Sequence, residues 1–113
     1  MSTLRRLDVL DEVWAYTVEE YKLDLLAHTF AMRVGVPGND EYPSHLIEME
    51  GVLSFNYSGE STDEWDYVEL TSIEAERLTT NGETRWKVGG EWWNATFEVI
   101  CECLLIDGHE VHD

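Results

Sequence analysis

Two short segments near the end of the chain contain the residue types that bind metals or act as nucleophiles. His109 and His112 lie three residues apart in a run that does not match the H-E-x-x-H pattern of helical zinc sites. Cys101 and Cys103 are the only cysteines, whereas structural zinc sites normally combine a thiol pair spaced by two to four residues with a second pair. We therefore predict an exposed tail and core thiols, with no metal and no cofactor.

Catalysis would require an activated thiol or a matched pair of carboxylates. Cys101 with His28 or His45 is the one possible nucleophile and base, but its apolar and acidic neighbours raise a thiol pKa instead of lowering it. Carboxylates alternate with apolar residues, as on a solvated sheet face, at Glu48, Glu50, Glu98 and Glu102. No glycine-rich segment matches a phosphate-binding pattern. We predict that the protein is not an enzyme.

Apart from the candidate metal-binding and catalytic residues, the most distinctive side chains are four tryptophans, Trp65, Trp86, Trp92 and Trp93. Trp92 and Trp93 are adjacent, so in a strand they face opposite ways. One of them belongs to the core, and the other needs a cover from a helix, a loop or a partner.

The composition indicates one domain with an acidic surface. The chain has 113 residues, 43% of them hydrophobic, with 24 Asp plus Glu against 7 Lys plus Arg and a net charge of -17. Such a surface repels nucleic acids and anionic membranes, and its complement is a protein partner with a basic surface. The alternative is a salt-adapted or generally acidic proteome. The sequence indicates no oligomeric state.

The elements that must position these residues are predicted from periodicity. Residues 1–16 have apolar residues at helical spacing, which predicts a helix. Residues 17–106 alternate as strands do, and residues 107–113 form a tail. Turns are predicted near 26–28, at Asn81-Gly82, at Gly89-Gly90 and at Asp107-Gly108. Residues 72–79 fit a strand after a register break near Thr71, although a short helix is the alternative.

The predicted fold is mainly β, of the α+β class. The N-terminal helix packs on an antiparallel meander sheet of about six strands, which rolls into a small sandwich or half-barrel. The core face of the last long strand carries Trp93, Ala95, Phe97, Val99, Cys101, Cys103 and Leu105.

The compartment is predicted to be the cytoplasm. No apolar run after the N-terminus indicates a secretory signal, and none has the length of a membrane span. Cys101 and Cys103 in one strand lie farther apart than a disulfide prefers, which favours reduced thiols.

The stretch from Trp65 to Ile73, together with 104–108 near the end, resembles the YxiG-like group of small bacterial proteins. That group is similar in size, acidity and β content to the immunity proteins encoded beside bacterial toxins. The resemblance implies a non-enzymatic inhibitor of a cognate toxin domain, and it carries no functional residues over.

Our first hypothesis is therefore an acidic, immunity-type inhibitor with a basic protein partner. Its predicted partner-binding residues lie on or beside the irregular segment, where side chains can point outward: Trp65, Asp66, Glu69, Glu74 and Glu76. The alternative is a small-molecule-binding β-fold with an aromatic-lined cavity, which the surplus of tryptophan favours.

Overall fold

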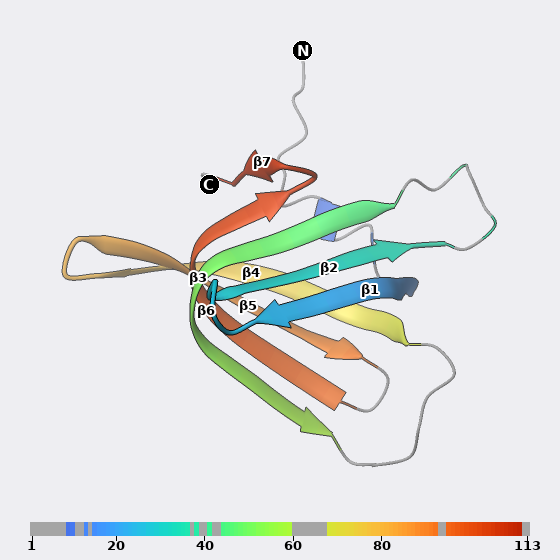
Figure 1. Ribbon diagram of the computed structural model, residues 1–113, viewed down its shortest axis with the longest axis horizontal. Coiled ribbons are helices and arrows are strands. Elements are labelled where there is room, and N and C mark those ends of the chain that lie inside the picture. Colours follow the sequence, from blue (N-terminus) through green and yellow to red (C-terminus); the bar gives the residue numbers. More distant parts are fainter. Residues whose placement is uncertain are drawn as a thin grey trace.

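The protein was analysed as a computed structural model, which describes residues 9–10, 13, 15–36, 38, 41, 44–59, 68–92 and 95–111. Strands account for 79% of these residues. They are β1 (Tyr16–Asp24), β2 (Thr29–Gly35), β3 (His45–Gly59), β4 (Glu69–Thr80), β5 (Glu83–Trp92), β6 (Ala95–Ile106) and β7 (His109–Glu110) (Figure 1).

Six of the strands form an antiparallel sheet that closes on itself in the order β1-β2-β3-β6-β5-β4. The closing contact is short: Tyr16 pairs with Leu70 and Thr17 with Glu69, and the amide of Val18 donates to the carbonyl of Val68 at 2.7 Å. The long β3 and β6 strands both bend sharply midway, so that the sheet curls around its apolar face (Figure 1).

The predicted N-terminal helix packed on a sheet is wrong for the described residues. Only positions 9 and 10 are helical, which is 2% of the described residues. Ala15 has a φ of 65°, which a right-handed helix does not allow, and β1 begins at Tyr16. Leu10 and Val13 still pack into the core. The spacing of these apolar residues therefore predicted their burial correctly, although it predicted the wrong backbone conformation. Among the described residues, no helix has the length and apolar character needed to cross a membrane.

Local turn chemistry explains the hairpins. Residues 25–28 form the turn between β1 and β2, as predicted, and Asp24 Oδ1 accepts hydrogen bonds from the amides of Leu26 and Ala27 at 3.1 and 3.0 Å. Asn81 and Gly82 have φ values of 54° and 81°, as a tight two-residue hairpin requires. Residues 72–79 are strand, and the predicted register break lies between Leu70 and Ser72.

The predicted turn at Gly89-Gly90 is wrong. Both glycines lie within β5, which runs on to Trp92, and Trp92 pairs with Ala95 at the start of β6. A Cβ atom at Gly90 would lie 2.5 Å from the Ser72 carbonyl oxygen and 2.6 Å from the Phe97 ring. The space around Gly90 therefore leaves no room for a side chain. The connection between β5 and β6 consists of residues 93–94, which lie outside the described residues.

The core fills the inside of the closed sheet. Ala95, Phe97, Val99 and Cys101 of β6 are buried as predicted, whereas Trp93 lies outside the described residues. The prediction that the odd-numbered side chains of β6 are buried along the whole strand holds only as far as Cys101. Cys103 and Leu105 are half-buried, and Leu104 and Ile106 are buried instead, because β6 bends opposite the positive φ of Gly51.

The segment predicted as an exposed tail folds back on the sheet. Asp107 and Gly108 have φ values of 54° and 81° and turn the chain into β7, which pairs with β6. Val111 is buried, and its amide donates to the carbonyl of Leu104 at 2.8 Å. His112 and Asp113 lie outside the described residues.

Candidate functional site: an aromatic pocket in the closed sheet

One end of the closed sheet contains an apolar cavity of about 330 Å³, which we call the inner pocket. Its lining residues come from β1, β2, β3 and β5 and from the residue before β4: Val18, Tyr21, Leu23, Phe30, Phe55, Tyr57, Val68 and Trp92. The volume falls at the lower end of the range of about 300–1,000 Å³ that is typical of small-molecule sites.

Ring contacts fix the floor of the inner pocket. Trp92 stacks on Phe97 with ring centres 4.4 Å apart and planes inclined by 22°. Phe30 meets Phe55 edge to face at 5.0 Å and lies 6.3 Å from the Trp92 ring. Interlocked rings of this kind hold one another in place. The absent side chain of Gly90 allows the stack, since Phe97 occupies the space a Cβ would need.

The indole nitrogen of Trp92, a residue that lines the inner pocket, is a buried donor. Trp92 is 9% exposed, its Nε1 atom is shielded from solvent, and no hydrogen-bond acceptor among the described residues reaches it. Leaving a buried donor unpaired costs about 1–3 kcal/mol, so most buried donors are paired. The described residues therefore leave one buried donor unsatisfied on a residue that lines the inner pocket.

The rim of the inner pocket exposes apolar surface on an otherwise acidic protein. Tyr21 is 73% exposed and Tyr57 is 51% exposed. Beside them lies a second hollow that shares Leu23 and Phe55 with the inner pocket and also includes Leu25, Val52 and Leu53. Contiguous apolar surface of this kind usually marks a binding region.

The lining residues of the inner pocket favour binding over acid–base chemistry. Among the lining residues that the structure describes, the only ionisable groups are the phenols of Tyr21 and Tyr57. Carboxylate, imidazole, amine and thiol groups do not occur among them. Such a set can stack on and enclose a ligand, but it supplies no activated nucleophile.

The predicted partner-binding residues separate in space. Trp65 and Asp66 lie outside the described residues. Glu69 is half-buried where β4 meets β1. Glu74 and Glu76 lie farther along β4 and do come together.

Glu74 and Glu76 line a polar hollow on the outer face of β4, β5 and β6, which we call the outer acidic hollow. Glu91 and Glu98 add two further carboxylates, and Lys87 Nζ lies 3.6 Å from a Glu98 oxygen. The hollow lies over Gly89, which is the cross-strand neighbour of both Glu74 and Glu98 and has no side chain to fill the space.

The two thiols are not activated. Burial and then the charge of Cys103 raise the pKa of Cys101 to about 12. Burial raises the pKa of Cys103, and so do its contact with Glu110, at 3.6 Å, and the carboxylates nearby. Both cysteines are free thiols, and both are protonated at neutral pH.

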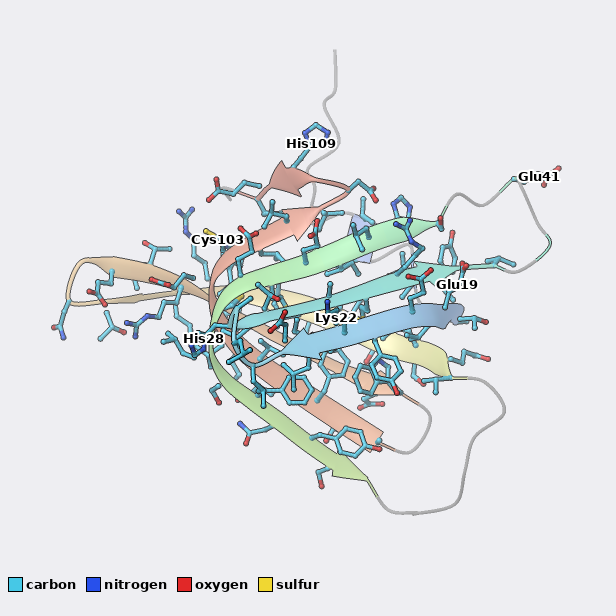
Figure 2. The ribbon with its side chains drawn as sticks, in the orientation of Figure 1. Glu19, Lys22, His28, Glu41, Cys103 and His109 are labelled. Carbon is cyan, nitrogen blue, oxygen red and sulfur yellow. The ribbon has the colours of Figure 1, made fainter. Side chains whose placement is uncertain are left out.

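The histidines lie apart. His28 is at the β1–β2 turn and His109 is on β7 (Figure 2). His45 Nδ1 lies 2.7 Å from Asp107 Oδ2, and Asp107 also accepts the amide of Leu46 at 2.9 Å, which ties β3 to the turn after β6. Among the described residues, no three His, Cys, Asp or Glu side chains converge as metal ligands do.

Sequence reasoning missed Trp92 as the pocket residue. It placed Trp93 on the core face of a strand that was expected to start after Gly90. Asn94, a residue that favours turns, was the signal that the hairpin lies at 93–94, which makes Trp92 a partner of Ala95 on the buried face.

Comparison with known proteins adds no family assignment. No protein-family model and no curated protein matches this chain. The resemblance to YxiG-like proteins therefore stays a prediction.

Proposed function

We propose that this protein is a non-enzymatic binding protein that holds a small apolar ligand in the inner pocket. The observation that carries the proposal is the lining of the inner pocket, since the described lining residues are all apolar or aromatic and five of these eight carry aromatic rings. Apolar pockets with a few fixed polar groups are typical of small-molecule sites. We place the protein in the cytoplasm, a proposal that its two free thiols support.

The test is titration with N-phenylnaphthylamine, a neutral dye whose fluorescence rises in apolar surroundings. Val68→Phe should fill part of the inner pocket and weaken dye binding at least about tenfold, the equivalent of about 1.4 kcal/mol. Val52→Phe is the matched control. Both valines are half-buried and pack against the core, but Val52 lines the second hollow instead.

Unchanged dye affinity in Val68→Phe, or an equal loss in Val52→Phe, would contradict binding in the inner pocket. Absence of dye binding by the wild-type protein would contradict the proposed function itself. Circular dichroism and urea unfolding of both variants would show whether each retains the fold.

The second candidate is the immunity-type inhibitor, with a basic toxin domain as its partner. The observation that favours it is the outer acidic hollow, where Glu74, Glu76, Glu91 and Glu98 surround one lysine. Opposite charges speed association, and salt screens them over about 8 Å at physiological ionic strength.

Its test uses the toxin domain encoded next to this chain's gene. Glu74→Lys combined with Glu76→Lys should slow association with that domain and reduce its salt dependence. The same reversal at Glu19 and Glu20, two exposed acids on β1, is the control. A gene with no toxin gene beside it, or equal association rates for both double variants, would contradict this candidate.

A further inference from the structure

We infer that one edge of β4, the stretch from Ser72 to Thr80, docks an extended segment of a partner protein as a further antiparallel strand. We call this stretch the open edge. In the segment that fits it, basic and apolar side chains alternate. The surface lies outside the inner pocket. The inference requires a partner with such a segment, whether or not that partner is a toxin.

The edge is open because the sheet closes over only a short part of β4. β1 pairs with β4 at Leu70 and Glu69, whereas β5 pairs with β4 from Leu70 to Thr80. Beyond Leu70, no strand among the described residues pairs with β4 on its β1 side. The β4–β5 hairpin projects from the closed sheet instead (Figure 1). An unpaired row of main-chain donors and acceptors is a template for another strand.

Hairpin geometry decides which main-chain groups face the open edge. The two-residue turn makes its flanking residues, Thr80 and Glu83, a hydrogen-bonded pair. Such pairs alternate with non-hydrogen-bonded pairs along an antiparallel ladder, and no register shift interrupts this ladder after Ser72. The even-numbered residues of the open edge therefore bond to β5. The odd-numbered residues, among them Ala75 and Thr79, direct their amide and carbonyl groups away from β5.

The side chains of the open edge set the composition of the partner segment. Ile73 is buried and Ala75 packs against the core, whereas Glu74 and Glu76 are exposed and line the outer acidic hollow. Residues directly opposite each other in paired strands lie on the same face of the sheet and interact. An added strand would therefore place basic side chains beside Glu74 and Glu76, and apolar side chains beside Ile73 and Ala75.

The charges favour a basic partner over a second copy of this chain. A symmetric pairing of two open edges centred on Ala75 would set Glu74 of one copy opposite Glu76 of the other, and like charges in that position are destabilising. The net charge of -17 adds repulsion between whole molecules. The outer acidic hollow, with its four carboxylates and one lysine, instead attracts a basic segment to this side of β4.

The test uses a short, end-blocked peptide in which lysine and valine alternate, in two isomeric forms. One form carries N-methyl groups on two valine amides, and the other carries them on two lysine amides. The two forms have the same side chains and the same charge. In the inferred pairing, valines lie opposite the odd-numbered residues of the open edge and exchange hydrogen bonds with them, so only methylation of valine blocks docking.

The lysine-methylated peptide should bind at least about tenfold more tightly than the valine-methylated peptide, since the second form loses main-chain hydrogen bonds. Fluorescence anisotropy of labelled peptides measures both affinities. Equal affinities would mean that charge alone attracts the peptides, which would overturn strand addition and leave the immunity-type candidate intact. The reverse preference, or no binding of either form, would also overturn the inference.

Amide hydrogen exchange of the wild-type protein locates the added strand without any variant. The lysine-methylated peptide should slow exchange at Ala75 and Thr79 at least about tenfold, whereas Glu74 and Glu76 should already be protected in the free protein. Protection confined to the exposed β1 residues Tyr21 and Lys22 would overturn the docking site. Sedimentation of the free protein as a dimer, with Ala75 and Thr79 already protected, would overturn the choice of partner in favour of a second copy.

Discussion

The inner pocket and the outer acidic hollow share β5 but otherwise lie on different strands, and they differ in the side chains that line them. The inner pocket is walled by rings and leaves a buried indole donor without an acceptor among the described residues. The outer acidic hollow brings four carboxylates and one lysine together in contact with water. Water solvates the carboxylates at little cost, whereas it does not reach the indole nitrogen. The two regions therefore differ in kind, one apolar and ringed, the other charged and solvated.

Glycine has opposite uses in the two regions. At Gly90 a missing side chain admits the Phe97 ring and so builds the inner pocket, whereas at Gly89 it leaves a space on the outer face. Adjacent residues of one strand therefore shape both concave surfaces.

Phe97→Ala should destabilise the protein by about 3–5 kcal/mol, as large core truncations do. Phe97 is 3% exposed and supports the Trp92 ring, so its loss removes both burial and the pocket floor. Urea unfolding measures the change, with the exposed neighbour Thr96→Ala as control. A loss below about 0.5 kcal/mol, the usual range for surface changes, would show that this face is not the core.

Gly90→Ala should destabilise by about 1–3 kcal/mol, because the new Cβ meets both a carbonyl oxygen and the Phe97 ring. Gly89→Ala should cause no loss, since the nearest atom to its Cβ is 3.8 Å away. Thermal unfolding of the two variants measures the difference. Equal stabilities would mean that Phe97 does not lie over Gly90.

The stability of the protein should fall as pH rises above 9. Cys101 has its pKa raised from 9.0 to about 12, so the unfolded chain loses this proton first. The stabilisation is fully present below pH 9 and is lost as pH rises towards 12, at up to about 1.4 kcal/mol per pH unit. The measurement is the slope of unfolding free energy against pH in the wild-type protein and in Cys101→Ala. Identical slopes would contradict a buried thiol.

Glu74→Lys combined with Glu76→Lys should have the smallest effect, a change in stability within about 0.5 kcal/mol and unchanged affinity for the neutral dye. Both side chains are exposed on the outer face, away from the inner pocket. The dye titration checks this independence. A loss of affinity as large as that expected for Val68→Phe would mean that the two regions are coupled.

Sequence periodicity predicted much of the sheet because local rules govern strands and tight turns. The Asn81-Gly82 hairpin and the strand at 72–79 are examples. Closure was not predicted, because it depends on pairs between β1 and β4 and between β3 and β6 that are distant in sequence. The helix prediction failed because Leu10 and Val13 have a spacing that fits burial in more than one conformation.

The candidate site was only partly accessible to sequence reasoning. The tryptophan surplus indicated a cavity, but the position of the turn decides whether Trp92 or Trp93 shares a face with Ala95: the turn was expected at Gly89-Gly90, whereas β5 continues to Trp92 and β6 begins at Ala95. Glu74 and Glu76 come together because they alternate on one strand, whereas Glu69 lies where β4 pairs with β1.

The most direct test of the central claim is an isotope-filtered nuclear Overhauser experiment on the wild-type protein saturated with N-phenylnaphthylamine. We expect contacts from the ligand to the methyl groups of Val18 and Val68, which line the inner pocket. Contacts confined to Val52 and Leu53, in the second hollow, or to Ala75, in the outer acidic hollow, would contradict the account.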